Sequence, residues 1–375
     1  MGLLKKLREC LHFIYTLQFW RMAIFWTLAL VFSYLKLYSQ NFLLKKSKRY
    51  PRCSPKDSTY VSKSLTRPIC VITGATSGLG AAAANVFANE GFYVVLVGRS
   101  SEQLSKVTYD IRKNRVDVCL KAFEVDVTSF KSIFKFKRSL QQWLLDSNLH
   151  PSIQLLINNA GILATTSRVT SEGYDQMFTT NYIGAFCITK VLLHLLESSP
   201  IPSRVVNVTS FTHRSVWSMQ MDKGAIKCPS KSKQYPYAEI YEYSKLCILL
   251  FSYELHRQVG MMEKRHKLSV VAVDPGAVKT NIMREIPSWI SQLSYAALKI
   301  LGMLQAPEDA VGSILDAALS PPETSGVYFF GGNGRTLASS VLSYDLKMSK
   351  NLWDTSNDLF RELQVALEKP ADIHP

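Results

Sequence analysis

The stretch PICVITGATSGLG at residues 68–80 decides the fold. Its apolar, β-branched beginning predicts a buried strand, and the alanine-rich run at residues 81–84 predicts a helix directly after the glycine turn. Glycines in such a turn let the backbone approach a pyrophosphate, which then lies at the positive end of the helix dipole. The alternative is an ordinary strand-to-helix turn. The residues of this turn that are candidates for binding a dinucleotide are Gly74, Ser77, Gly78, Leu79 and Gly80.

The same alternation of apolar runs and helix-length segments continues along the chain. Further strand candidates lie at 92–98, 119–127, 153–161, 204–210, 267–276 and 326–332. Helix candidates between them lie at 79–90, 101–114, 129–145, 174–198 and 241–259. Strands that alternate with crossover helices predict an α/β fold with a doubly wound, Rossmann-type parallel sheet. We therefore expect one catalytic domain at 67–335 and a C-terminal helical appendage at 336–375.

The second strand candidate ends in Val97-Gly98-Arg99. At this place an NAD-binding domain would usually present a carboxylate to the ribose 2′-hydroxyl. A guanidinium can instead pair bidentately with a 2′-phosphate, so Arg99 favours NADP(H) over NAD(H). The alternative is a solvated arginine at the end of a strand.

The N-terminal segment carries most of the basic excess. The formal net charge is +15, and residues 1–56 contain many Lys and Arg but a single acid, Glu9. Residues 11–35 are apolar and aromatic apart from Arg21 and a few polar groups, which predicts a membrane-anchor helix within residues 1–44. Its charge-free part, 22–35, is shorter than the about 20 residues that a perpendicular span needs. A single-pass span is favoured, and an interfacial helix, a cleaved signal peptide and a buried helix are the alternatives.

The distribution of charge around this apolar run predicts an orientation. More Lys and Arg follow the run than precede it, mostly in a basic linker at 45–66 and just before it, so we expect the catalytic domain to face the cytosol. We take the endoplasmic reticulum as the expected membrane, although the charge pattern does not specify an organelle. Nucleic-acid binding is disfavoured because the basic residues gather beside an apolar segment and no nucleic-acid-binding motif accompanies them. The seven cysteines contain no CxxC pair and the histidines no paired ligand spacing, so we expect neither a disulfide framework nor a metal site.

A constellation of polar residues follows the fourth and fifth strand candidates. Tyr241 and Lys245 lie four residues apart in a helical pattern, so their side chains share one face. A nearby ammonium favours the phenolate and would lower the pKa of Tyr241 toward neutrality, which suits proton transfer. Ser210 ends a strand candidate and can hydrogen-bond a substrate oxygen. The amide of Asn181, within the 174–198 pattern, can hold a relay water.

These motifs together resemble the short-chain dehydrogenase/reductase family over residues 67–335, and within it the membrane-associated, retinol dehydrogenase-like branch. The matching motifs are TGATSGLG (73–80), Asp126-Val127, NNAG (158–161), NYIGAF, RVVNVTS, YEYSK and PGAVKT (275–280). The resemblance implies an oxidoreductase that interconverts an alcohol and an aldehyde or ketone. Arg99 adds the expectation of NADP(H), and the predicted anchor adds that of a lipophilic substrate such as a retinoid, steroid, polyprenoid or fatty aldehyde. The resemblance leaves the oligomeric state open.

Carried over residue by residue, the resemblance implies a role for each catalytic candidate. Tyr241 would be the general acid and base, and Lys245 would hold the nicotinamide ribose. Ser210 would orient the carbonyl, and Asn181 would anchor the relay water. The resemblance also implies contacts to the cofactor. Asp126, followed by Val127, would contact the adenine, and the turn with Asn158, Ala160 and Gly161 would shape the floor of the cofactor site. The nicotinamide side would be lined by Pro275, Gly276 and Thr280.

The stretch between Ser210 and Tyr241 is longer than is common in this family. We expect the inserted residues 211–235, which include His213, to cover the substrate site, and a packed or solvated role for His213 is favoured over a substrate contact. A second reading is a regulatory or scaffold protein that senses NADP(H) on the same fold without turnover. The intact set of four catalytic candidates favours the enzyme.

Replacing Arg99 with Asp should shift the ratio of kcat/KM with NADP to kcat/KM with NAD by about tenfold or more toward NAD. The new carboxylate would repel a 2′-phosphate and accept a hydrogen bond from a 2′-hydroxyl. Steady-state kinetics with both cofactors measures the ratio, and an unchanged ratio would refute the role of Arg99.

Overall fold

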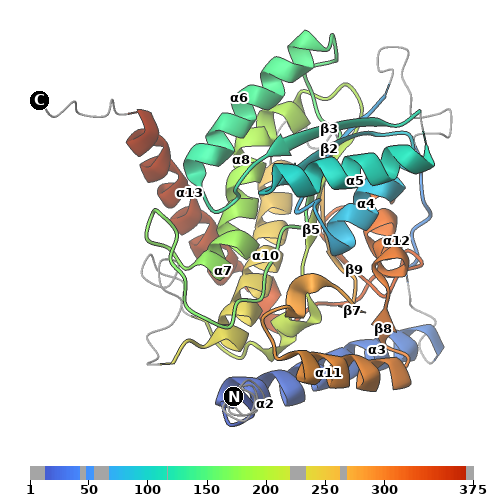
Figure 1. Ribbon diagram of the computed structural model, residues 1–375, viewed down its shortest axis with the longest axis vertical. Coiled ribbons are helices and arrows are strands. Elements are labelled where there is room, and N and C mark those ends of the chain that lie inside the picture. Colours follow the sequence, from blue (N-terminus) through green and yellow to red (C-terminus); the bar gives the residue numbers. More distant parts are fainter. Residues whose placement is uncertain are drawn as a thin grey trace, which may run out of the picture.

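A parallel sheet of seven strands forms the centre of the computed structural model, in the order β3-β2-β1-β4-β5-β6-β9 (Figure 1). The structure describes residues 13–42, 48–54, 67–115, 117–219, 234–261 and 268–368. The strands of this sheet are β1 Ile69–Thr73, β2 Tyr93–Gly98, β3 Cys119–Glu124, β4 Leu155–Asn158, β5 Ser203–Val208, β6 Leu268–Asp274 and β9 Val327–Phe330. Each predicted strand is present, and the predicted doubly wound α/β fold is confirmed.

Helices cover both faces of the sheet (Figure 1). One face carries α4 Gly78–Asn89, α5 Ser101–Asn114 and α12 Pro307–Ala318. The other carries α6 Phe130–Asp146, α8 Gly184–Glu197 and α10 Tyr237–Gly260, with α7 Gln176–Phe178 and the π-helical turn η2 Thr179–Ile183 leading into α8. Because both faces are covered, β1, β4, β5 and β6 are buried along their whole length, which explains their continuous apolar runs.

The order of the strands reverses beside β1, which marks one edge of the sheet. The first three strands run outward from β1 to β3, and the chain then returns to β4 on the other side of β1. In open parallel sheets, ligands bind beyond the carboxyl ends of the strands at this reversal of strand order. The turns that follow β1, β4, β5 and β6 all lie at this edge, and they contain most of the predicted site residues.

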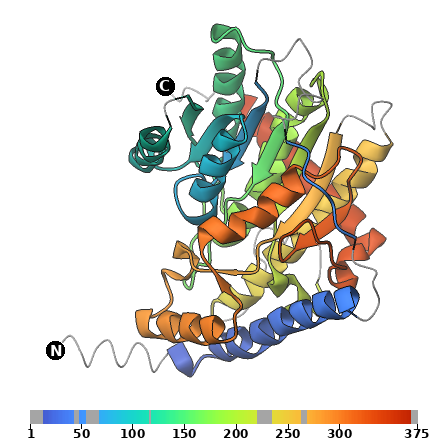
Figure 2. The same ribbon diagram turned by 90° about the vertical axis from the view of Figure 1, so that its right-hand side faces the viewer.

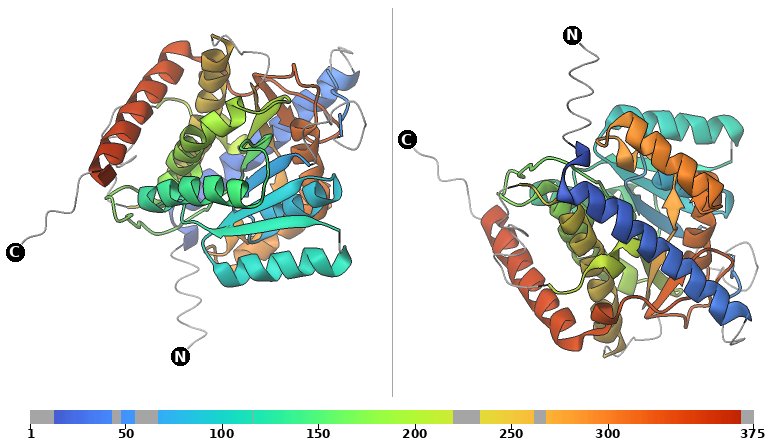
Figure 3. Two further views of the ribbon diagram at one scale, coloured as in Figure 1. Left: turned by 90° about the horizontal axis from the view of Figure 1, so that it is seen from above. Right: turned by 90° about the horizontal axis from the view of Figure 1, so that it is seen from below.

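The predicted anchor helix packs across this same edge instead of standing apart. It comprises α2 Leu17–Trp20, the π-helical η1 Arg21–Trp26 and α3 Thr27–Phe42, and its stretch from Leu17 to Gln40 is long and apolar enough to cross a membrane. The helix lies beside α11 Ser288–Ile300 at one end of the molecule (Figures 2 and 3). Leu30, Ser33 and Leu37 are buried against the domain. A buried helix is the least favoured of the alternatives that the sequence leaves open.

Short elements join α11 to the sheet edge. The two-residue strands β7 Ala277–Val278 and β8 Leu304–Gln305 pair with each other, and η4 Asn281–Met283 leads toward α11. After β5 the chain forms η3 Phe211–Ser215. Residues 220–233 of the predicted covering insertion lie outside the described residues, as does most of the predicted linker at 45–66. The described part of that linker packs on the domain, because Arg52 pairs with Asp316 at 2.6 Å.

The C-terminal segment is helical as predicted, but it packs into the main core. It consists of η5 Val341–Tyr344 and α13 Leu346–Glu368, which lies along α10. The rings of Phe251 and Trp353 stack with their centroids 6.2 Å apart. The hydroxyls of Tyr182 and Ser356 lie 2.7 Å apart in a buried hydrogen bond. The helix therefore covers α8 and α10 and is not a separate appendage.

Replacing Leu352 with Ala should lower the free energy of unfolding by about 2–5 kcal/mol, because this fully buried side chain of α13 belongs to the main core. Urea unfolding of the full chain followed by circular dichroism measures the change. Val365→Ala on the exposed face of the same helix is the control, and we expect a change within about 0.5 kcal/mol for it. Equal losses in the two variants would contradict the docking of α13.

Candidate active site

The glycine turn after β1 is shaped for close approach by a ligand. Gly74 and Gly78 have φ values of 67° and 52°, which side chains other than glycine rarely adopt. A Cβ at Gly80 would overlap the carbonyl oxygen of Gly74. In the described structure the Ser77 side chain makes no hydrogen bond to the first turn of α4, so the N–H groups there, including that of Leu79, can receive an anion. These features fit a dinucleotide pyrophosphate.

The turn after β4 is fastened to the glycine turn. The Thr73 hydroxyl accepts hydrogen bonds from the backbone N–H of Asn159 at 3.0 Å and of Ala160 at 3.1 Å. A Cβ at Gly74 would lie 2.8 Å from the Cα of Ala160. A Cβ at Gly161 would lie 3.4 Å from Lys245 Nζ. Ala160 and Gly161 therefore join the glycine turn to the catalytic candidates.

Asn158 differs from the expectation that it shapes the cofactor floor. It belongs to β4, and its amide donates to the Thr189 hydroxyl at 2.9 Å and to Asn207 Oδ1 at 2.8 Å. The side chain is buried among these groups and faces the core between β4, β5 and α8. Alternation along a strand decides which way a side chain points, and a motif alone does not show it.

The residues predicted to contact the adenosine half lie after β2 and β3. Arg99 is exposed at the end of β2, and the neighbouring Gly98 packs against Thr76 of the glycine turn. The Asp126 carboxylate accepts from the backbone N–H of Thr128 at 2.9 Å and from its hydroxyl at 2.7 Å. Val127 is buried, and its carbonyl packs against Gly184. Asp126 is thus held rigidly at the same edge of the sheet as Arg99.

Three of the four catalytic candidates meet at the carboxyl end of β5. The Ser210 side chain lies near enough to the Tyr241 hydroxyl to lower its pKa. Lys245 Nζ lies 5.6 Å from the centroid of the Tyr241 ring and donates to the Val208 carbonyl at 3.3 Å. The Thr209 hydroxyl donates to the Lys245 carbonyl at 2.8 Å, so Thr209 fastens β5 to α10. The sheet and one turn of α10 therefore bring together groups from distant parts of the chain.

Asn181 lies next to this group, but its side chain is already engaged. Its Oδ1 accepts from the Ile162 N–H at 2.8 Å, and Nδ2 donates to the Ile162 carbonyl at 3.0 Å and to the Ser244 hydroxyl at 3.1 Å. Both amide hydrogens are used. A relay water could therefore reach Asn181 only through the remaining lone pair of Oδ1 or through the backbone of η2.

The electrostatics of the pair differ from the expectation that the ammonium lowers the phenol pKa. Burial raises the pKa of Tyr241, the negative charge of Asp274 raises it further, and the nearby Ser210 side chain lowers it. Burial lowers the pKa of Lys245 to about 8, against the opposing attraction of Asp274. Within the protein alone, desolvation therefore sets the direction of both pKa shifts, and the expected lowering of the Tyr241 pKa is not found.

Asp274, at the end of β6, is the functional candidate that sequence reasoning missed. Its carboxylate accepts from the Gly276 N–H at 2.7 Å and from the Tyr328 hydroxyl at 2.8 Å. Burial raises its pKa to about 6, while these two donors and the charges of Arg214 and Lys245 hold it down. The only available signal was its place directly before Pro275-Gly276 in a predicted buried strand.

His213 is a packed residue, as favoured above. It is fully buried, its Nδ1 lies 2.5 Å from the Ser210 carbonyl, and its Nε2 accepts from the Ser340 N–H at 3.2 Å. Because Nε2 is an acceptor, the proton lies on Nδ1 and is donated to Ser210. Burial lowers the pKa of His213 to about 3, so the ring stays neutral and fixes the backbone at Ser210.

The loop after β6 lies opposite the glycine turn. A Cβ at Gly78 would lie 3.2 Å from Thr280 Cγ2, so the two loops approach each other closely. Gly276 has a φ of 80°, and the Pro275 carbonyl accepts from Gln305 Nε2 at 2.9 Å. The predicted cofactor residues of this loop therefore face the turn that begins α4.

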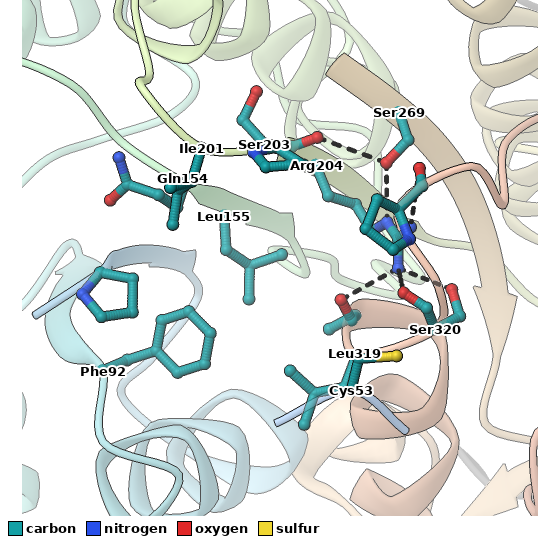
Figure 4. Close-up of a pocket in the computed structure, with 14 residues that line it drawn as sticks. Cys53, Phe92, Gln154, Leu155, Ile201, Ser203, Arg204, Ser269, Leu319 and Ser320 are labelled. Atoms are coloured by element: carbon teal, nitrogen blue, oxygen red, sulfur yellow. Dashed lines mark hydrogen bonds between the residues drawn. The ribbon is translucent and has the colours of Figure 1, made fainter. Parts of the chain in front are cut away.

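A small cavity lies at the opposite, amino ends of β1, β4 and β5 (Figure 4). Arg204 reaches along it and donates to the carbonyls of Ala317 at 2.9 Å and Ser320 at 2.7 Å, and to the Ser269 hydroxyl at 2.8 Å. These bonds join β5 to the end of α12. The cavity is remote from the glycine turn and belongs to the packing of the domain. Among the described residues, no group of three His, Cys, Asp or Glu side chains could hold a metal ion.

Comparison with known protein families matches residues 68–291 to the family described as short chain dehydrogenase. The chain belongs to this family. Human polyprenol dehydrogenase is 30% identical over 307 residues, covering 80% of this chain and 87% of the relative. Human retinol dehydrogenase 13 is 28% identical over 305 residues, covering 80% and 85%. The resemblance to the retinol dehydrogenase-like branch is confirmed.

The fold agrees with solved members of the family. An NADPH-bound short chain oxidoreductase from Pseudomonas aeruginosa, with an atypical catalytic centre, superposes with a TM-score of 0.54 at 20% identity, covering 73% of this chain and 98% of that structure. Members of the short-chain dehydrogenase/reductase family use NAD(P), and the dehydrogenases above are named for alcohols. The protein is an oxidoreductase that acts on CH–OH groups.

Asp274 should make the protein less stable as the pH rises from about 4 to about 6. Its pKa in the folded state is about 6, above the ordinary value of 3.8, so the folded state binds more protons than the unfolded state in this range. The resulting stabilisation is complete below the lower pKa and is lost as the pH rises through the higher one. Urea unfolding across this range should show a flatter pH profile for Asp274→Asn. Parallel profiles for the variant and the wild type would contradict the assignment.

Proposed function

We propose that this protein is an NADP(H)-dependent oxidoreductase that interconverts an alcohol and an aldehyde or ketone on a lipophilic substrate. The proposed substrate classes are retinoids, steroids, polyprenoids and fatty aldehydes. The observation that carries the proposal is that Ser210, Tyr241 and the buried Lys245 meet at the carboxyl end of β5, with Lys245 Nζ 5.6 Å from the centroid of the Tyr241 ring and next to the turn after β4. A binding module without turnover has no need of this arrangement.

The glycine turn and Arg99, both at the carboxyl ends of the strands, suit a nicotinamide dinucleotide. Gly74, Gly78 and Gly80 leave room for a pyrophosphate at the start of α4, and exposed Arg99 can pair with a 2′-phosphate. The NADPH in the related Pseudomonas structure is consistent with this preference. When bound, the nicotinamide would supply or accept a hydride at C4.

The protein groups would orient the substrate and move a proton. Ser210 would donate a hydrogen bond to the substrate oxygen, and the Tyr241 hydroxyl would give that oxygen a proton in reduction or take one in oxidation. Lys245 would hold the nicotinamide ribose, and a charged ribose-bound ammonium beside the ring would favour the phenolate. Asn181 would position a relay water through Oδ1 or its backbone. Asp274 supports the positive charge of Lys245 from within the core.

The outer surface of the N-terminal helix favours a membrane location. Its exposed apolar side chains include Leu17, Trp20, Ile24, Leu28 and Leu35, and α11 beside it exposes Trp289 and Leu293. A helix docked through its inner side and apolar on its outer side suits an interfacial position better than a perpendicular span. We propose the cytosolic face of the endoplasmic reticulum as its place. The relatives named for polyprenol and retinol support a lipophilic substrate drawn from that membrane.

Replacing Tyr241 with Phe should lower kcat by about 10²–10⁴-fold, because it removes only the hydroxyl that carries the proton. The affinity for NADPH, measured by fluorescence titration, should stay near that of the wild type. Turnover of the purified full chain with retinal and with farnesal gives the rates.

The matched control is Tyr243→Phe on the same helix, whose hydroxyl donates to Glu239 and lies outside the cluster. It should leave kcat nearly unchanged. Tight binding of NADPH by a wild-type chain that turns over no aldehyde of a lipid panel would favour the sensor reading and refute the enzyme.

A further inference from the structure

We propose that the N-terminal helix is a wall of the active site, held there by Glu242, and that Trp26 is a specificity-determining residue beside Tyr241. The inference deepens the proposed function and rests on it. A membrane anchor needs only to hold a domain near a bilayer, and its sequence does not have to reach the catalytic centre. Here the helix contacts three segments that carry predicted site residues.

The first contact is an ion pair at the residue next to Tyr241. Glu242 is fully buried on α10, and Arg21 donates to it through Nη2 at 2.6 Å and through Nε at 2.9 Å and 3.1 Å. The Trp26 indole N–H donates to the same carboxylate at 2.7 Å. A buried carboxylate is costly unless it is paired and hydrogen-bonded. Glu242 obtains both its counter-charge and these donors from the N-terminal helix.

The local form of the helix makes this double contact possible. Residues Arg21–Trp26 form the π-helical segment η1. In a regular α-helix two residues five apart would point about 140° away from each other, given 3.6 residues per turn. The wider π-helical turn brings Arg21 and Trp26 toward one side, and both reach Glu242. Such segments are rare and occur frequently at functional sites.

The second contact is between the aromatic rings of Trp26 and Tyr241. The ring centroids of Trp26 and Tyr241 lie 5.3 Å apart, with planes inclined by 39°. Trp26 is only half-buried, so part of the indole is left free to contact a substrate. The carbon atoms next to a carbonyl group bound by Ser210 and Tyr241 would therefore lie against this indole.

The helix continues along the site beyond Trp26. Arg214, in η3 after Ser210, donates to the buried Ser33 hydroxyl at 3.0 Å. Farther along, a Cβ at Gly276 would lie 3.3 Å from the Tyr34 hydroxyl. The same helix thus touches α10 at Glu242, the turn after β5 and the loop after β6, which together surround the proposed reaction centre.

The first test replaces Trp26 with Ala in the full chain, purified in detergent with NADP⁺ as oxidant and two alcohols as probes. Geranylgeraniol has a double bond and a methyl branch near its carbinol carbon, whereas 1-hexadecanol is linear. Removing the indole should raise the ratio of kcat/KM for geranylgeraniol to kcat/KM for 1-hexadecanol by about tenfold, the scale that a change of pocket shape produces. The affinity for NADP⁺ should stay unchanged.

The matched control is Leu28→Ala on the exposed side of the same helix, which should leave the ratio as in the wild type. A general loss of structure would lower both kcat/KM values together and would not change their ratio. An unchanged ratio in Trp26→Ala overturns the assignment of Trp26 as a specificity-determining residue.

The second test measures the placement of the helix without turnover. Arg21→Gln, Glu242→Gln and the double variant are compared by thermal unfolding. If the pair holds the helix, each single variant lowers the melting temperature. The melting temperature of the double variant then falls by less than the sum of the two single decreases. Additive falls overturn the placement. Should the wild-type chain oxidise neither alcohol, the proposed function fails, and this coupling still decides whether the helix is docked at Tyr241.

Discussion

Parallel strands must all end at the same edge of their sheet, and the candidate site depends on this constraint. The turns after β1, β4, β5 and β6 come from distant parts of the chain, yet they meet within a few ångströms of one another. Hydrogen bonds from backbone groups of the β4 turn to Thr73, and from Thr209 to Lys245, fix their relative positions. The residues of the four turns are thereby placed at one candidate site.

Burial sets the electrostatic character of this edge. Lys245 and Asp274 are each taken out of water, which disfavours the charged form of both, and each lowers that cost for the other. The same balance appears between Arg21 and the fully buried Glu242. Buried charges of this kind persist only when their partners are held in place, because removing one partner would leave the other buried and uncompensated.

The sequence predicted the elements well where the pattern is local. Apolar runs and helix-length segments located all seven strands of the main sheet, and α5 at residues 101–114 matches its prediction at both ends. The group of Ser210, Tyr241 and Lys245 was also predicted from motifs. The motif did not predict the direction in which each side chain points, because Asn158 shares it with Ala160 and Gly161 yet faces the core. Asp274 was missed because a single acid at the end of a strand carries no distinctive spacing.

By itself the sequence determined the order of strands and helices, the glycine turn, the basic N-terminal excess and the family, since these depend on residues close together in the chain. Only the tertiary structure decided where the N-terminal helix lies. Its apolar composition suits a membrane as well as a protein surface, and the choice rests on pairings such as Arg21 with Glu242 that join residues 221 positions apart. No local pattern records such a pairing, because its free energy exists only once the sheet has brought α10 to the same edge.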